Sequence, residues 1–257
     1  MKFRRHSSAS MLLFAVLAFP AYGCVDDGAE TADEQYIASA NPWDEADAFV
    51  KASLVWVELP SGGSCSGVIV GPRSVLTADH CVDIGSAEDY AVRFADHSEE
   101  TVWAMKRNAS ADLAVLTINR IAWEIGHAPA AIHDAQTNSL LPGHRVIVSG
   151  VGETFSGAGD FGTRNWGKIE FDTYVGNYTL AGGLQYSSGL MFRPEPCQGS
   201  DPACSSVCPG DSGGPVFQWR SDGGWGVIAI NSGSHCTNHD RRLLAADARA
   251  WRSWILD

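Results

Sequence analysis

Short apolar runs separated by polar breaks dominate the chain after residue 48. The runs are rich in β-branched and aromatic residues, and Gly, Pro, Asn and Asp interrupt them. They cover residues 49–59, 66–71, 74–78, 90–96, 113–118, 144–152, 166–175 and 225–233. Many short strands with turn signals between them are typical of an all-β sandwich or barrel. We therefore expect an all-β fold.

The C-terminal stretch, residues 241–257, has a different pattern. Leu244, Ala248, Trp251 and Ile255 follow one another at spacings of 4, 3 and 4 residues, which places them on one face of a helix. The pattern predicts a C-terminal α-helix that packs this face against the core.

The N-terminus has the three parts of a secretory signal. Three basic residues stand within the first five positions, an apolar run covers residues 11–21, and small residues lead to Cys24. The run is shorter than the roughly 20 residues that a membrane-spanning helix needs. We therefore expect residues 1–23 to be a signal peptide of an exported protein.

Cys24 has two interpretations. The sequence "AYGC" that ends at Cys24 resembles a bacterial lipoprotein signal, in which the cysteine becomes the lipidated first residue. Such signals usually carry Leu three places before the cysteine, where this chain has Ala21. The protein is thus either anchored to a membrane through lipidated Cys24 or secreted without it.

Composition indicates a globular domain behind an acidic segment. With 257 residues, 45% hydrophobic and 10% aromatic, the chain can form a substantial core. Residues 24–48 are acidic and lack an apolar period, which predicts a linker or a short pro-segment before a domain over residues 49–257. The net charge of −12 argues against nucleic acid as a partner, because phosphate binding needs a basic surface.

Three short motifs carry candidate chemistry. The sequence "SSVCPGDSGGPVF" surrounds Ser212 with glycines, but a serine hydroxyl is a poor nucleophile until a base takes its proton. His80, in "LTADHC", directly precedes Cys81, and a bridge from Cys81 to Cys65 would fix the backbone that carries the imidazole. Asp112, in "SADLAVL", leads into an apolar run, where a buried carboxylate needs a partner. Each motif taken alone also fits a structural role.

Together, "LTADHC", "SADLAVL" and "GDSGGPV" in this order resemble the chymotrypsin-like (trypsin-fold) serine proteases, and the exported chain looks like a bacterial secreted member. The resemblance covers roughly residues 49–257. It implies two antiparallel six-stranded β-barrels, split near residue 140, with a C-terminal α-helix.

The resemblance also assigns roles in the active site. It implies that Ser212 is the nucleophile, His80 the general base and Asp112 the group that orients the imidazole. The backbone N–H groups of Gly210 and Ser212 would hold the oxyanion that forms during attack on a carbonyl. Glycine suits position 210 because it tolerates positive φ without strain.

The cysteines fit the same scheme. The family bridges the positions of Cys208 and Cys236, which leaves Cys197 and Cys204 to each other, beside the Cys65–Cys81 pair. A zinc site is the alternative for clustered Cys and His, but the chain has no CxxC pair and no HExxH. We expect no metal and no cofactor.

Specificity is indicated by two segments. Counting six residues back from the nucleophile places Ser206 at the base of the substrate pocket, with Val207 beside it. A neutral base does not indicate a preference for Lys or Arg, and it favours an apolar or aromatic P1 side chain. "INSG" takes the place of the family's "VSWG", with Ser232 at the position of the Trp, so Asn231, Ser232 and Gly233 would supply the backbone edge for an extended peptide.

Two aspartates depart from the family pattern. No Lys or Arg lies between His6 and Val50, so we expect no tryptic cleavage that would release the usual N-terminal partner of Asp211. Either Asp211 has another cation or hydrogen-bond donor as its partner, or a different protease removes the acidic segment. Asp79 stands where the family usually has Ala. It either raises the pKa of His80 or points away from it, and adjacent residues at a strand end usually face apart.

The sequence therefore predicts an exported serine endopeptidase, secreted or in the cell envelope, that acts as a monomer on polypeptides. One alternative is a non-catalytic protease homologue that binds partners, against which the intact His, Asp and Ser set argues. The other is a serine esterase or transferase, which activity on esters but not on peptides would identify.

Overall fold

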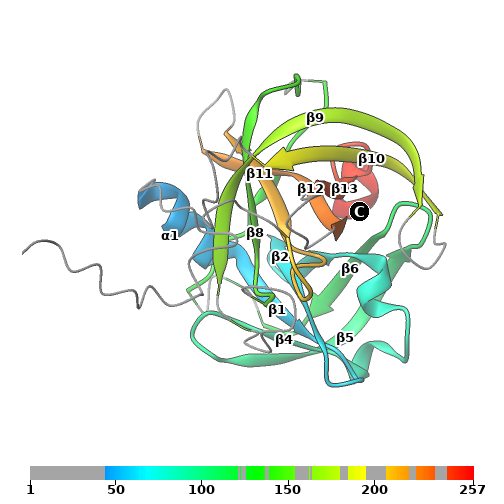
Figure 1. The fold of residues 1–257 in the computed structure, drawn as a ribbon. Coiled ribbons are helices and arrows are strands. Elements are labelled where there is room, and N and C mark those ends of the chain that lie inside the picture. Colours follow the sequence, from blue (N-terminus) through cyan, green and yellow to red (C-terminus); the bar gives the residue numbers. More distant parts are fainter. Residues whose placement is uncertain are drawn as a thin grey trace, which may run out of the picture. The chain divides into compact units, whose positions relative to one another are not determined.

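The computed structural model describes residues 44–120, 122, 126–136, 139–153, 162, 164–179, 185–194, 207–219, 224–234 and 242–257. All of them belong to one compact unit, Thr31–Asp257. This part of the chain is mostly β, with a helix at each of its ends (Figure 1). No helix among the described residues is long and apolar enough to cross a membrane. The predicted signal peptide and Cys24 lie outside the described residues.

The first group of strands forms a closed barrel in the order β1-β2-β3-β6-β5-β4. Its strands are β1 (Leu54–Glu58), β2 (Ser64–Gly71), β3 (Ser74–Thr77), β4 (Ala91–Arg93), β5 (Glu99–Asn108) and β6 (Leu113–Ile118). Two short 3₁₀ turns, η2 (Asp79–Val82) and η3 (Ala87–Asp89), connect β3 to β4. All pairings in the barrel are antiparallel.

The second group forms a seven-stranded sheet in the order β11-β8-β9-β10-β13-β12-β7, with an additional β11–β12 pairing. Its strands are β7 (Ala131–Ile132), β8 (Arg145–Gly150), β9 (Asn165–Thr179), β10 (Gln185–Pro194), β11 (Pro215–Trp219), β12 (Trp225–Ser234) and β13 (Leu243–Asp247). The additional pairing joins six antiparallel strands into a ring, and β7 adds to it in parallel with β12. The prediction of two barrel-like β structures is confirmed.

One apolar cluster joins the two strand groups. It combines Ile69 and Leu76 of the first barrel with Phe217 and Ile230 of the second sheet. A second cluster, which includes Phe171, lies within the second sheet. Because the first cluster packs strands of both groups together, loops from both groups can meet at one site with little freedom to shift.

The start of the domain differs from the prediction. The run 49–59 was expected to be extended, but helix α1 spans Asp44–Ser53 and β1 begins only at Leu54. The sequence of the helix contains good helix formers (Ala, Glu and Lys), and Phe49 packs edge-on against Phe217 with ring centroids 5.2 Å apart. The helix also begins within the segment expected to be a linker.

The prediction of a long C-terminal helix is wrong in its first half. Leu244 lies in β13, Ala248 lies in the following turn, and helix α2 covers only Arg252–Leu256. Strand β13 pairs with β10 on one side and β12 on the other, so its backbone groups are satisfied without a helix. The apolar spacing that suggested one helical face is produced by a strand, a turn and a short helix.

Candidate active site

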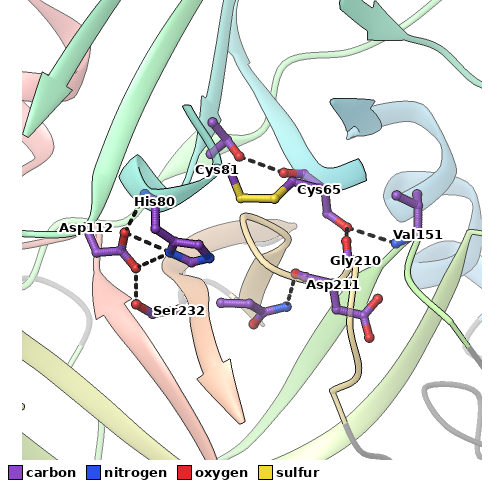
Figure 2. Close-up of a disulfide and its surroundings, with 11 residues drawn as sticks. Cys65, His80, Cys81, Asp112, Val151, Gly210, Asp211 and Ser232 are labelled. Atoms are coloured by element: carbon purple, nitrogen blue, oxygen red, sulfur yellow. Dashed lines mark hydrogen bonds and ion pairs between the residues drawn. A yellow bond between two sulfur atoms is a disulfide. The ribbon is translucent and has the colours of Figure 1, made fainter. Parts of the chain in front are cut away.

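His80 and Asp112 meet at the ends of two paired strands. His80 lies in η2, directly after β3, and Asp112 directly precedes β6, the neighbour of β3. Both carboxylate oxygens of Asp112 lie 3.0 Å from Nδ1 of His80, and Oδ1 also accepts from the His80 backbone N–H at 3.0 Å (Figure 2). The carboxylate therefore fixes both the ring and the backbone of His80.

The backbone at Asp112 explains why an aspartate can approach His80 in this way. Its φ is 54°, in the left-handed region that Asp and Asn enter more readily than most residues. The side chain is fully buried. A buried carboxylate needs partners, and the hydrogen bonds to His80 provide them.

Ser232 is a third contact of the Asp112 carboxylate. Its Oγ donates a hydrogen bond to Oδ2 of Asp112 and lies 3.2 Å from the hydroxyl of Tyr178. Ser232 is 2% exposed, so its side chain lies behind Asp112 and does not occupy a pocket wall in place of a Trp. The β12–β13 register shifts between Asn231 and Gly233, at the position of Ser232. Nothing local in the sequence signals the contact between Ser232 and Asp112.

The environment of His80 favours its charged form. Burial alone would lower the pKa of His80, but the hydrogen bond and charge of Asp112, together with Asp83 and Asp79, raise it above its usual 6.5. The side chain of His80 is 22% exposed. No described residue forms a hydrogen bond with Nε2, so this nitrogen is available to a reacting group.

Asp79 points away from His80. Its carboxylate forms a two-pronged ion pair with Arg107 of β5, with Nε to Oδ1 at 2.8 Å and a terminal guanidinium nitrogen to Oδ2 at 2.9 Å. Asp79 is buried, and its charge also contributes to the raised pKa of His80. Arg107 was not identified from the sequence, because nothing local to it signals this contact.

Ser212 lies in a tight turn between Cys208 and β11. The N–H of Gly213 donates to the carbonyl of Asn231 at 2.8 Å, and the Ser212 carbonyl accepts from the N–H of Ser66 at 2.7 Å. Gly210 and Gly213 have φ of 92° and 83°, where side chains are strained. Within the described ranges, no group accepts a hydrogen bond from the N–H of Gly210 or Ser212.

Asp211, beside Ser212, is fully buried and bound by backbone groups. Its Oδ1 accepts from the N–H of Gly152 at 2.8 Å and its Oδ2 from the N–H of Cys208 at 2.9 Å. A Cβ on Gly150 would lie 2.0 Å from Oδ1, so the carboxylate occupies space that a side chain at 150 would need. Burial raises the pKa of Asp211 to about 7, although both N–H groups oppose the shift.

The substrate-edge residues are only partly described. Val207 and Asn231 are buried, and the Asn231 amide donates to the carbonyls of Ser149 and Asp211, both at 3.2 Å. The Asn231 side chain therefore ties β12 to the turn that carries Ser212. Gly233 lies in β12, and Ser206 lies outside the described residues.

One predicted disulfide is confirmed. Cys65 and Cys81 are bonded, with their Cα atoms 6.2 Å apart, and the bridge joins β2 to η2 next to His80 (Figure 2). Cys208 is also part of a disulfide, while its predicted partner Cys236 lies outside the described residues. Cys197 and Cys204 lie outside them as well. Among the described residues, no group of three or more His, Cys, Asp or Glu could hold a metal ion.

Comparison with known proteins agrees with this geometry. The family model of Trypsin matches residues 47–255. The vitellin-degrading protease of Bombyx mori is 26% identical in an alignment of 207 residues, and the match covers 75% of this chain and 75% of that protein. Spermosin of Halocynthia roretzi is 25% identical in an alignment of 222 residues, and the match covers 76% of this chain but 54% of that protein. Both organisms are eukaryotes, so these relatives do not support a bacterial type. The chain belongs to the trypsin-like serine protease family.

Proposed function

We propose that the protein is a serine endopeptidase with Ser212, His80 and Asp112 as its catalytic triad. The contact between His80 and Asp112 carries the proposal. Both Asp112 oxygens lie 3.0 Å from Nδ1, and Nε2 has no hydrogen-bond partner among the described residues. An imidazole held in this way is oriented to accept a proton at Nε2. Family membership supports Ser212 as the donor of that proton.

The proposed reaction uses these residues in sequence. Nε2 of His80 takes the Ser212 hydroxyl proton as Oγ attacks the carbonyl carbon of the substrate. The N–H groups of Gly210 and Ser212, which have no acceptor within the described ranges, bind the resulting oxyanion. His80 then gives its proton to the leaving amine, and the acyl group stays on Ser212. Water, deprotonated by His80, hydrolyses this ester and restores the enzyme.

Asp112 stabilises the imidazolium that forms during both steps. Its contacts with His80 favour the tautomer that carries a proton on Nδ1, which leaves Nε2 free to act as the base. The hydrogen bond from Ser232 holds the carboxylate in place from the other side.

The end of β12 supports a peptide substrate. The β11–β12 ladder ends at the Pro215–Ile230 pair, while β12 continues to Ser234. The backbone of Asn231 is already bound to the Ser212 turn, because its N–H donates to the Gly214 carbonyl and its carbonyl accepts from the Gly213 N–H. We propose that Ser232 and Gly233, which follow it, offer the edge against which an extended peptide pairs. The name of the Bombyx mori relative describes it as a protease, which supports a polypeptide substrate for this chain as well.

The proposal includes the parts of the site that lie outside the described residues. Ser206, with Val207 beside it, forms a neutral pocket base that favours apolar or aromatic P1 residues. The Cys208–Cys236 disulfide forms a pocket wall, and Cys197 pairs with Cys204. The protein is exported through residues 1–23, acts as a monomer, and is either secreted or anchored through Cys24.

Turnover of paired peptide and ester substrates tests the proposal. Purified residues 25–257 should hydrolyse a P1-varied peptide library, fastest with apolar or aromatic P1 residues. Ser212→Ala should lower kcat by about 10⁶-fold with an unchanged fold. Hydrolysis of esters but not of peptides would instead identify an esterase. A folded wild-type chain that is inactive both before and after residues 25–43 are trimmed would identify a binding homologue.

A further inference from the structure

Ser66 contacts both residues whose N–H groups are proposed to bind the oxyanion. Its Oγ donates to the carbonyl of Gly210 at 2.9 Å, and its backbone N–H donates to the carbonyl of Ser212 at 2.7 Å. The same Oγ accepts from the N–H of Val151 at 2.9 Å (Gly210 and Val151 are labelled in Figure 2). Ser66 is fully buried in β2, so these contacts exclude water.

These contacts, with one from Glu153, determine the direction of the Gly210 N–H. The Pro209 carbonyl accepts from the Glu153 N–H at 2.9 Å, and no described peptide bond is cis. In a trans peptide the N–H points opposite to the preceding carbonyl, so the Gly210 N–H points away from Glu153. The Gly210 carbonyl is held separately by Ser66. Both peptides that flank the Gly210 Cα are therefore fixed.

Glycine alone would not fix this arrangement. Gly210 has φ of 92°, but a glycine also populates negative φ readily. The hydrogen bonds, and not the residue type, select the conformation in which the Gly210 N–H has no acceptor among the described residues. The Gly210 carbonyl belongs to the next peptide, whose N–H, that of Asp211, donates to the Cys208 carbonyl at 3.0 Å. Removing the Ser66 hydroxyl would release the carbonyl side of this peptide and loosen the φ and ψ of Gly210, on which the direction of its N–H depends.

The described groups that bind the Asp211 carboxylate carry no charge, so the contacts of Ser66 matter more for the position of the turn. These groups are the N–H groups of Gly152 and Cys208. The turn is thus held by neutral hydrogen bonds from the second sheet and by Ser66 from the first barrel. Val151, which donates to Ser66, is adjacent to Gly152, so Ser66 and Asp211 are anchored to the same short segment.

We propose that Ser66 is a positioning residue for the oxyanion hole: its hydroxyl connects the Val151 N–H to the Gly210 carbonyl and thereby directs the Gly210 N–H toward the substrate. This inference rests on the proposed peptidase function. Ser66 does not touch the substrate and acts through the Gly210 peptide.

The test compares Ser66→Ala with Ser53→Ala. Ser53 is a matched control, because it is also fully buried and its Oγ donates to a backbone carbonyl, that of Phe49 at 2.9 Å, but in helix α1. Ser66→Ala should lower kcat by about 10- to 100-fold with KM within about twofold, as expected for weakened oxyanion binding. Ser53→Ala should leave kcat unchanged. Melting temperatures of both variants identify any loss that is only structural.

A second variant separates catalysis from stability. Ser66→Thr keeps the hydroxyl and adds one buried methyl group, so it should retain kcat within about threefold even if its melting temperature falls. Equal kcat values for wild type and folded Ser66→Ala would overturn the inference and leave the proposed function standing. An inactive wild-type chain would instead contradict the proposed function itself.

Discussion

The two halves of the site are held by different kinds of interaction. On the first barrel, His80 is oriented by the carboxylate of Asp112, and the preceding residue, Asp79, forms an ion pair with Arg107. On the second sheet, the turn that carries Ser212 is held by neutral hydrogen bonds to its carbonyls and to Asp211. The orientation of His80, the proposed proton acceptor, thus depends on a charged partner. The position of the turn that carries Ser212, the proposed nucleophile, depends on backbone hydrogen bonds.

The difference is clearest at Asp112 and Asp211, which are both fully buried. Asp112 faces an imidazole that would become charged in the proposed reaction, so its negative charge would then have a partner. Among the described residues, Asp211 has two N–H donors, and burial raises its pKa to about 7. Substitutions that remove charge should therefore have different consequences at these two positions.

Apart from removal of the Ser212 hydroxyl itself, the largest effect is expected at the charged half. Asp112→Asn keeps the size of the side chain but removes the acceptor for the Nδ1 proton and favours the wrong tautomer of His80. We expect kcat to fall by about 10⁴-fold with little change in KM. Steady-state kinetics of the folded variant measure this effect.

Asp247→Asn is the matched control for this substitution. Asp247 is also buried and also bound to a basic residue, Arg249, at 2.9 Å. Its substitution should change stability and leave kcat within a few-fold of wild type. A similar loss of kcat in both variants would mean that Asp112 has only a structural role.

The corresponding substitution on the second sheet, at Asp211, should lower kcat less than Asp112→Asn does. Asp211→Asn replaces one acceptor oxygen by an NH₂ group, which opposes the N–H of either Gly152 or Cys208. The turn would then shift, and we expect kcat to fall by about 10²- to 10³-fold, the loss typical of a missing oxyanion donor. Kinetics at saturating substrate measure it, and wild-type kcat in this variant would show that the neutral contacts do not position the turn.

Asp211→Asn should also change how the stability of the folded chain depends on pH. A folded-state pKa of about 7 against an ordinary 3.8 means that the folded chain keeps a proton that the unfolded chain loses above about pH 4. The contribution of Asp211 to stability therefore decreases as the pH rises from about 4 to about 7. Asp211→Asn should remove this decrease, and thermal unfolding across that range would detect it.

The pH dependence of activity reports on His80. Only neutral His80 can accept the Ser212 proton, and its pKa is raised above 6.5. We expect kcat/KM to rise about tenfold per pH unit below this pKa and to level off above it. A plateau that extends well below pH 6.5 would contradict the raised pKa.

The smallest effect is expected for the pair behind His80. Asp79→Ala installs the residue that the family usually has and removes the contact with Arg107, whose side chain is 36% exposed. Because Asp112 orients His80 independently, we expect kcat within about threefold and a loss of about 1 kcal/mol of stability. A double-mutant cycle with Arg107→Ala measures the coupling. A loss of kcat comparable to that of Asp211→Asn would contradict this ranking.

The sequence predicted what is encoded locally. The β-rich fold and the Cys65–Cys81 bridge follow from runs, turns and spacing, and His80, Asp112 and Ser212 were nominated from short motifs. Ser66 and Arg107 were not nominated, and Ser232 was assigned to the substrate edge but not to Asp112. The partners of these three residues, Gly210, Asp79 and Asp112, lie far away in the chain and meet them only in the folded state.

The two wrong elements have a similar cause. Residues 49–53 are helical because Phe49 and Val50 pack on the core from a helix, and Leu243–Asp247 are extended because strands lie on both sides. In both cases tertiary contacts decided between two conformations that the local pattern allowed.

Labelling of the uncut chain by a fluorophosphonate tests the central claim most directly. Residues 25–257 should label with a stoichiometry near one per chain without proteolysis, because Asp211 is already held by Gly152 and Cys208, and Ser212→Ala should not label. Labelling that begins only after residues 25–43 are trimmed would show that the turn is not preset. Labelling that persists in Ser212→Ala would contradict the assignment of the nucleophile.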